Sequence, residues 1–228
     1  MKVMKKITLG SILFVVALLS ISLSLVSPAA AGFTDLSDEE MKGVLFMREE
    51  EKLARDVYLC FAELYPEYSI FSNIASSEQN HMDAIKRIID RYDLIDPVVD
   101  DSVGIFTNES LQELYDALIT EGSVSLVEAL RVGAAIEEID ILDIEEYLKS
   151  SDERMINRIY NNLLDGSENH LRAFVKELSM QGVNYLPQYL DDEAFQDIID
   201  DESDPGRNGP IWSELVDWVK GLFRWRFG

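Results

Sequence analysis

Glu78 and His81 carry the clearest chemical signal in the sequence. Three residues apart, they fall on one face of a helix. That face is otherwise apolar and comprises Ile74, Glu78, His81, Ile85, Ile88 and Tyr92. A Glu-x-x-His pair is a recurrent metal-binding element of helical bundles, because its carboxylate and imidazole can bind one ion together. We therefore expect this helix face to bind a metal ion.

His170 repeats half of this pattern. It lies on a second apolar stripe at helical spacing, which comprises Ile156, Tyr160, Leu163, Ser167, His170, Phe174 and Leu178. Ser167 stands where a second Glu-x-x-His pair would have its glutamate. Glu168 lies only two residues before His170 and points well around the helix. The second half of the predicted site therefore lacks one carboxylate.

Two further stretches can supply carboxylates. Glu137 lies on an apolar stripe, with Glu138 beside it and Asp140 one turn further on. Residues equally far from the turn of a helical hairpin lie at one level, and this favours Glu137 over Asp140 as the partner of His170. Asp140 or Glu138 would then be an additional or bridging carboxylate. An earlier stretch turns one of two adjacent glutamates inward, and the pattern does not choose between Glu50 and Glu51.

The metal expected here is iron or manganese. Burying several unpaired carboxylates is costly, and no Lys or Arg lies on these stripes to balance them. Two imidazoles cannot neutralise the set, whereas a pair of cations can. One cysteine and two histidines exclude zinc sites built from cysteine pairs and sites with three histidines. An oxygen-rich ligand set with one or two imidazoles is typical of iron or manganese.

Four long helices are predicted to position these residues. They cover about 38 to 64, 70 to 92, 125 to 148 and 152 to 181, and a short helix runs from near 108 to 122. Capping boxes mark three helix starts, with the pairs Ser37 and Glu40, Ser125 and Glu128, and Ser150 and Glu153. Short links join the first two and the last two long helices, whereas a long crossover joins the second to the third. The predicted fold is all-α, a ferritin-like four-helix bundle.

Charge and the two chain ends define the remaining organisation. The 228 residues carry 43 acidic against 20 basic side chains, a net charge of −23, which excludes nucleic acid as a default partner. Residues 1–31 are typical of a signal peptide, and the apolar run 7–26 is long enough to serve instead as a membrane anchor. The domain is expected over 37–189, outside the cytoplasm. Residues 190–228 are expected to form an acidic linker and an amphipathic aromatic and basic tail, which docks on the bundle or contacts a membrane surface.

Four motifs occur in order along the chain: Glu-Lys-Leu-Ala-Arg-Asp-Val-Tyr (51–58), Ser-Glu-Gln-Asn-His (77–81), Ala-Ala-Ile-Glu-Glu-Ile-Asp-Ile-Leu-Asp (134–143) and Gly-Ser-Glu-Asn-His-Leu-Arg-Ala-Phe (166–174). Together they resemble the DUF2202 family of the ferritin-like superfamily over about residues 37–189. The resemblance implies a helical bundle with a metal site but no particular reaction. The first motif is also similar to a helix of rubrerythrins, which supports Glu51 as a ligand and puts Tyr58 near the metals.

We therefore expect an exported protein that binds two iron or manganese ions and acts on iron(II), oxygen or peroxide. It would be a di-iron oxidoreductase of the ferroxidase or peroxidase type, with metal ions and a small oxidant as partners, and it is compatible with a homodimer. Tyr58 is an expected catalytic residue, as is Arg172, which would orient a carboxylate. The alternative is a non-catalytic extracellular binding or structural module, which Ser167 keeps open. The expected metal ligands are Glu51, Glu78, His81, Glu137, Asp140 and His170.

Overall fold

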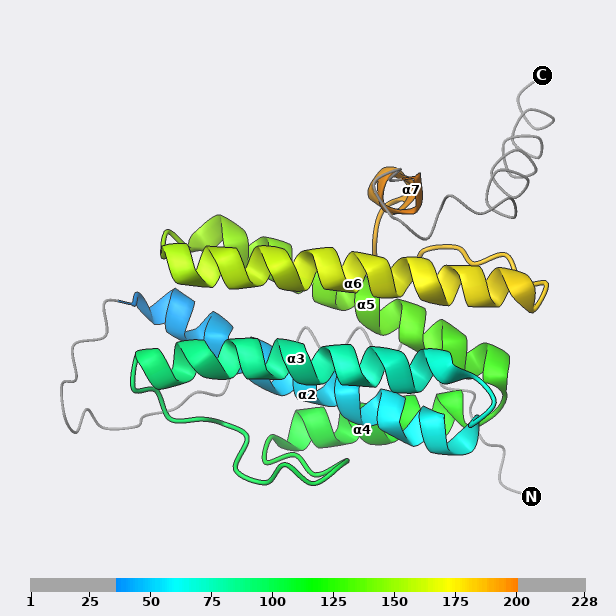
Figure 1. Cartoon of the computed structure of the whole chain (residues 1–228), viewed down its shortest axis with the longest axis horizontal. Coiled ribbons are helices and arrows are strands. Elements are labelled where there is room, and N and C mark those ends of the chain that lie inside the picture. The colour runs from blue at the N-terminus through cyan, green and yellow to red at the C-terminus, as the bar shows by residue number, and fades with distance from the viewer. Residues whose placement is uncertain (1–35, 201–228) are drawn as a thin grey trace. The chain divides into compact units, whose positions relative to one another are not determined.

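The computed structural model describes residues 36–200, which form six helices and no strand (Figure 1). The all-α prediction is confirmed for this part of the chain. Of the described residues, 36–190 belong to one compact unit and 191–200 belong to a second. The predicted signal or anchor (1–31, with its apolar run 7–26) and the aromatic tail beyond residue 200 lie outside the described residues. Within the described range, no helix is long and apolar enough to cross a membrane.

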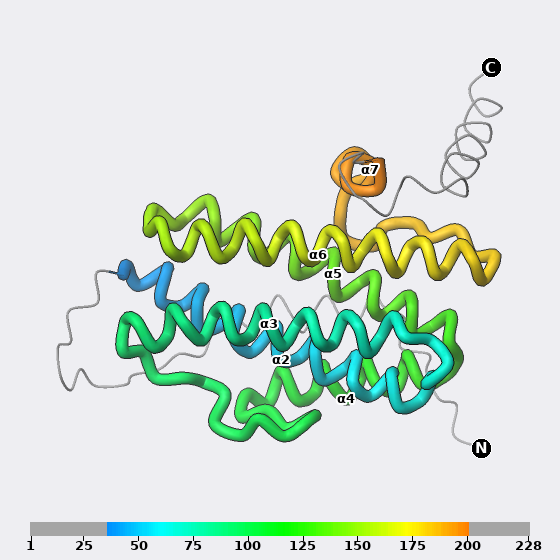
Figure 2. The backbone as a smooth tube through the Cα atoms, viewed as in Figure 1, coloured from blue at the N-terminus to red at the C-terminus, as the bar shows by residue number. Residues whose placement is uncertain are grey.

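Two helical hairpins form most of the first unit. α2 (Asp38–Leu64) packs along α3 (Ser69–Arg91), and α5 (Leu126–Ser150) packs along α6 (Arg154–Met180). α2 also contacts α5, and α3 contacts α6, so the two hairpins lie against each other (Figure 2). Apolar side chains from all four helices meet in a common core. The predicted limits of these helices are correct to within two residues.

Glu40 fixes the start of α2 and joins it to the second hairpin. Its backbone N–H donates to Ser37 Oγ at 3.2 Å, and its Oε2 accepts the Ser37 backbone N–H at 2.9 Å, as the predicted capping box requires. Its other oxygen, Oε1, accepts hydrogen bonds from the Ser151 hydroxyl at 2.8 Å and the Glu153 backbone N–H at 3.1 Å. The start of α2 is thus tied to the turn between α5 and α6.

The starts of α5 and α6 are capped in different ways. At α5, Ser125 Oγ accepts the Glu128 backbone N–H at 3.2 Å, as predicted. The third predicted box is wrong, because Glu153 is itself the N-cap of α6 and accepts the Ile156 backbone N–H at 2.9 Å. Ser150 still belongs to α5. A carboxylate in the cap position satisfies the free N–H groups of a helix start as well as a serine hydroxyl does.

Buried charges fix the crossover to α2. This connection runs from residue 92 to α4 (Glu109–Gly122) and on to α5. Asp56 accepts hydrogen bonds from Lys52 Nζ at 2.5 Å and from the Gly104 backbone N–H at 3.0 Å. Arg48 donates to both carboxylate oxygens of Asp96, each at 3.2 Å. These contacts place one face of α2 against the crossover. The neighbouring face of α2 therefore packs against the other long helices.

Glu138 holds the segment that follows α6. α6 is followed by Gly182, whose φ of +74° lies in the left-handed region that favours glycine. The Glu138 carboxylate then accepts the backbone N–H groups of Tyr189 at 2.7 Å and Leu190 at 2.9 Å, and the hydroxyl of Tyr185 at 2.7 Å. A buried carboxylate with several donors of this kind is a structural group.

α7 (Asp192–Asp200) belongs to the second unit. The sequence predicted an acidic linker here, and part of that linker is this helix. Asp191 Oδ1 accepts the Ala194 backbone N–H at 2.8 Å at its start, and Phe195 and Ile198 are its buried side chains. Its nine residues span too short a pattern to indicate a helix within so acidic a stretch.

Candidate metal centre

The four long helices bring two histidines and three glutamates together in the core. Glu51 comes from α2, Glu78 and His81 come from α3, Glu137 comes from α5 and His170 comes from α6. All five are buried. They form two groups that could each hold a metal ion, with ligand atoms within 4.8 Å of one another: Glu51, Glu78 and His81, and Glu78, Glu137 and His170. Glu78 is shared by both groups.

Glu78 lies between the two imidazoles. Its Oε2 is 2.7 Å from His81 Nδ1, and its Oε1 is 2.8 Å from His170 Nδ1. Glu51 Oε2 approaches His81 Nδ1 at 3.2 Å from one side, and Glu137 Oε2 approaches His170 Nδ1 at 3.3 Å from the other. The two rings stack with centroids 5.5 Å apart. Both Nδ1 atoms therefore face carboxylate oxygens, in the arrangement expected of a pair of ions bridged by one carboxylate.

Gly166 makes room for His81. A Cβ at this position of α6 would lie 2.6 Å from His81 Nε2, so no larger residue fits without moving the ring. With Nε2 against the α6 backbone, Nδ1 is the ring nitrogen that faces the glutamates. The sequence analysis quoted Gly166 within a motif and gave it no role, because contact between α3 and α6 cannot be deduced from a local pattern.

Tyr58 orients Glu137. Its hydroxyl donates to Glu137 Oε1 at 2.5 Å and lies 3.3 Å from the Gly133 carbonyl oxygen. Burial and the neighbouring Glu137 carboxylate raise the pKa of Tyr58 well above its ordinary value, so the phenol keeps its proton. Glu137 Oε1 is thus engaged by Tyr58, and Oε2 faces His170.

Ser167 and Asp140 occupy the place of the missing glutamate. The Ser167 hydroxyl donates to Asp140 Oδ2, and its oxygen lies 3.0 Å from the Leu163 carbonyl oxygen. Asp140 lies outside both three-residue groups. Burial, together with repulsion from Glu137 and Glu78, raises the pKa of Asp140 to about 8. Asp140 is therefore a neighbour of the two groups, and its role as a ligand stays a prediction.

The adjacent glutamates point in different directions. Glu51 faces His81, whereas Glu50 forms a hydrogen bond with Asp143. Glu138, beside Glu137, binds the segment after α6, as described above. The geometry therefore brings Glu51 and Glu137 to the histidines and leaves the other two glutamates outside the groups.

Arg172, expected to orient a carboxylate, is buried on α6. It donates to Asn169 Oδ1 at 2.8 Å and lies 3.7 Å from Glu168. Asn169 and Glu168 both belong to the same helix as Arg172. Its assignment as a residue that orients a metal-binding carboxylate stays a prediction.

The two histidines balance only part of the negative charge that the carboxylates of the cluster carry. Burial lowers the pKa of both histidines, but the surrounding carboxylates outweigh this and raise the pKa of His81 to about 12 and that of His170 to about 10. The two imidazolium groups in turn hold the pKa of Glu78 well below its ordinary value, although burial opposes this. Burial and repulsion from Asp140 raise the pKa of Glu51.

Unpartnered oxygens test whether cations fit this donor set. Glu51 Oε1 and Asp140 Oδ1 are buried and have no hydrogen-bond partner. Such atoms are rare in folded proteins and require an explanation. Carboxylate oxygens and imidazole nitrogens are ligands that iron and manganese accept. The donor set therefore fits two cations, and Glu78 is the residue common to both groups.

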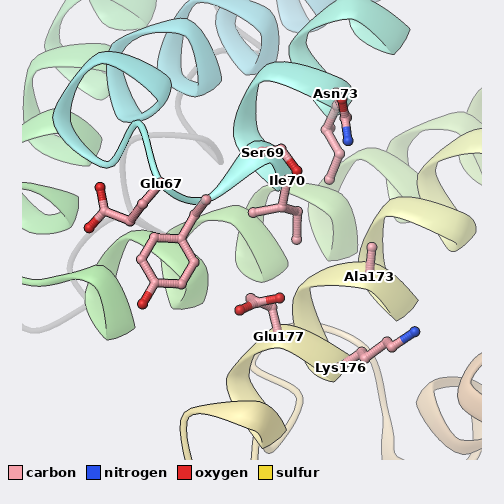
Figure 3. A pocket seen from close by; sticks show the side chains of 9 residues that line it. Glu67, Ser69, Ile70, Asn73, Ala173, Lys176 and Glu177 are labelled. Carbon is pink, nitrogen blue, oxygen red and sulfur yellow. The ribbon is translucent and has the colours of Figure 1, made fainter.

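An open hollow lies apart from these residues, near the turn between α2 and α3 (Figure 3). Its walls come from that turn, from the start of α3 and from α6, and Glu67, Lys176 and Glu177 are its charged residues. None of the buried carboxylates of the two groups lines it. The hollow begins one helical turn from the cluster, since Ile74 precedes Glu78 by four positions and lines its wall.

Comparisons with known proteins agree with the motifs. Residues 40–202 match the family described as "Uncharacterized protein domain (DUF2202)". The uncharacterized protein MJ0754 of Methanocaldococcus jannaschii is 47% identical over 173 residues, which cover 76% of this chain and 93% of that protein. The crystal structure of hypothetical protein MJ0754 superposes with a TM-score of 0.70 at 46% identity, covering 79% of this chain and all of that one. The chain belongs to the DUF2202 family.

Proposed function

We propose that this DUF2202 protein binds a dinuclear centre of iron or manganese and acts on iron(II), oxygen or peroxide. The observation that carries the proposal is the position of Glu78, whose two oxygens lie 2.7 and 2.8 Å from the Nδ1 atoms of two different histidines. A carboxylate that faces two imidazoles in an apolar core is suited to bridge two cations.

The two groups divide the ligands between the ions. Glu51 and His81 would hold one ion, Glu137 and His170 would hold the other, and Glu78 would contribute to both. Asp140 is available as an additional carboxylate. Two antiparallel hairpins joined by a long crossover support the interpretation of the fold as a ferritin-like four-helix bundle.

Iron or manganese bound in such a site supplies one-electron transfers to oxygen or peroxide. The chain supplies positioning and exclusion of water. Tyr58 fixes the orientation of Glu137 and retains its proton beside the carboxylates. Phe174 packs against the Tyr58 ring with centroids 5.3 Å apart, and Phe71 packs against Phe174 at 6.0 Å. These buried rings keep one side of the centre apolar, which strengthens the interaction between carboxylates and cations.

A non-catalytic binding or structural module is the second candidate. The hydrogen bond between Ser167 and Asp140 favours it, because it satisfies one oxygen of the cluster with a neutral donor in place of a second glutamate. Such a module would retain the bundle without redox chemistry. We further propose export through residues 1–31, with cleavage after Ala31 or retention by the apolar run 7–26.

Metal titration of the chelator-treated protein tests the proposal. Equilibrium dialysis against Mn²⁺, or against Fe²⁺ without oxygen, should give two ions per chain in the wild type and none in the double variant Glu78→Ala/His81→Ala. Glu168→Gln is the matched control and should still bind two. Addition of oxygen or peroxide to the iron-loaded protein should then oxidise the iron faster than iron free in buffer. Two bound ions without such oxidation would favour the structural module. Unchanged metal content in the double variant would contradict the assignment of Glu78 and His81 as metal ligands.

A further inference from the structure

Glu50 lies in a stretch where α2 and α5 run antiparallel. At one end of this stretch, the Tyr58 hydroxyl lies 3.3 Å from the Gly133 carbonyl oxygen. At the other end, a Cβ at Gly43 would lie 2.6 Å from the ring of Tyr147, so this glycine lets the ring rest on α2. Residue numbers thus rise along α2 as they fall along α5. Glu50 of α2 and Asp140 of α5 both lie between these two contacts.

Two carboxylates on successive turns of α5 meet Glu50 here. Asp143 shares a hydrogen bond with the Glu50 carboxyl group, and Asp140 lies close enough to repel it. Glu50 is only 8% exposed and Asp140 only 6%. Glu50 Oε2 and Asp140 Oδ1 nevertheless have no hydrogen-bond partner. Buried carboxylate oxygens that lack a hydrogen-bond partner are costly unless a cation binds them.

Asp140 connects Glu50 and Asp143 to the candidate metal centre. It repels the carboxylates of Glu137 and Glu78, and it also repels Glu51. Ser167 fixes its Oδ2, which leaves the orphaned Oδ1 as the second oxygen of this carboxylate. The inner end of the acidic series therefore borders both groups of candidate ligands.

Asp143 connects Glu50 and Asp140 to the solvent. Asp143 is half-buried, and Glu146, one turn further along α5, lies near it with a side chain that is 77% exposed. Tyr147 lies near both Glu39 of α2 and Glu146. At this outer end Glu146 pairs with Lys149 at 3.6 Å and Glu39 pairs with Lys42 at 3.0 Å, so both signs of charge surround the half-buried Asp143.

We propose that divalent cations reach the buried centre along a carboxylate path between α2 and α5, formed by Asp143, Glu50 and Asp140. The path rests on the proposed function, since it supplies the dinuclear centre. A cation passing along it exchanges water for one carboxylate after another and does not cross an apolar barrier. The hollow of Figure 3 is the competing route, but no buried carboxylate lines it.

Loading kinetics test the path. Chelator-treated wild type, Asp143→Asn, Glu50→Gln, Glu177→Gln and Glu145→Gln are mixed with Co²⁺ in a stopped-flow spectrometer, and loading is followed by cobalt absorbance. Release is followed after addition of excess chelator, and stoichiometry is measured by dialysis. Asp143→Asn and Glu50→Gln should load about tenfold more slowly and still bind two ions at equilibrium. Glu177→Gln, in the competing hollow, and Glu145→Gln, on the exposed side of α5, should load like wild type.

The rate of metal release distinguishes a residue on the path from a metal ligand. A residue on the path lowers the barrier in both directions, so its loss should slow release as well as entry. Slower entry with faster release in Glu50→Gln would make Glu50 a ligand and would overturn the path. Normal loading in Asp143→Asn, or slow loading confined to Glu177→Gln, would also overturn it. If the wild type binds no Co²⁺, the proposed metal centre itself is wrong. If two ions bind and the rates in Asp143→Asn and Glu50→Gln equal those of the wild type, only the path is wrong.

Discussion

His170 Nδ1 lies 2.8 Å from Glu78 Oε1, although the two residues belong to helices of different hairpins. The other oxygen of Glu78 lies 2.7 Å from His81 on its own helix. Glu78 is thus the side chain through which the two halves of the cluster meet. Variants at this position should therefore affect both proposed ions at once.

Glu78→Gln should reduce binding at both positions, whereas Glu51→Gln should weaken only the position that contains His81. The difference follows from the sharing of Glu78 between the two groups. Isothermal titration with Mn²⁺ would resolve the two affinities. Glu138→Gln is the control, because Glu138 binds the segment after α6. It should cost about 2 kcal/mol or more of stability and leave both affinities unchanged. Equal loss of both sites in Glu51→Gln would contradict the division of ligands.

Tyr58→Phe should weaken the position that contains Glu137 by about 10- to 100-fold. The substitution keeps the ring that packs on Phe174 and removes only the hydroxyl that donates to Glu137 at 2.5 Å. Glu137 would then lose the group that orients it. Titration of the variant with Mn²⁺ measures the effect, and near-wild-type affinity at both positions would show that Tyr58 does not orient this carboxylate.

Gly166→Ala should disturb His81, because the added methyl group would lie 2.6 Å from its Nε2. We expect a loss of about 1 to 3 kcal/mol in the free energy of unfolding and weaker binding at the position that contains Glu51. Gly43→Ala is a matched control, since its methyl group would meet Tyr147 at the same distance. It should cost stability while leaving equilibrium metal binding intact. The same metal affinity in both variants would argue against a special role for Gly166.

Stability of the metal-free protein should fall as pH rises from about 5.5 to 8. Asp140 has a pKa of about 8 in the folded state, against an ordinary value of 3.8. Between these values the folded chain holds a proton that the unfolded chain releases, so raising the pH favours unfolding, by up to about 1.4 kcal/mol per pH unit. The raised pKa of His170 acts in the same direction above pH 6.5.

Thermal unfolding at several pH values measures this slope. Asp140→Asn should flatten it, because the amide does not titrate. Addition of Mn²⁺ should also reduce the slope, since bound cations would balance the carboxylates. A metal-free wild type that gains stability between pH 5.5 and 8 would contradict the charge balance inferred for the cluster.

The sequence predicted the long helices and the burial of Glu78 and His81 on one helix face, since both depend on local spacing. Glu78 and His81 share a face of one helix, and the apolar stripe around them indicated that this face is buried. The choice between Glu50 and Glu51 depended on how α2 packs, and contacts from Asp56 to Gly104 and from Lys52 to Ser102 of the crossover set that rotation. Such contacts join residues about 50 positions apart, beyond the reach of any helical period.

Other features could not be predicted because two groups compete for one role. Glu153 replaced Ser150 as the cap of α6, since both lie in the same turn and both can accept the free N–H groups. Glu137 and Glu138 are adjacent and both buried, yet one faces His170 and the other binds the segment after α6. Only the position of that segment, which follows 50 residues later, separates their roles.

Anomalous X-ray diffraction from crystals soaked in Mn²⁺ tests the central claim most directly. The account predicts two anomalous peaks within the bundle, one beside His81 Nδ1 and Glu51 and the other beside His170 Nδ1 and Glu137, with Glu78 contacting both. A single peak, peaks only at surface carboxylates, or an empty cluster at saturating Mn²⁺ would contradict it.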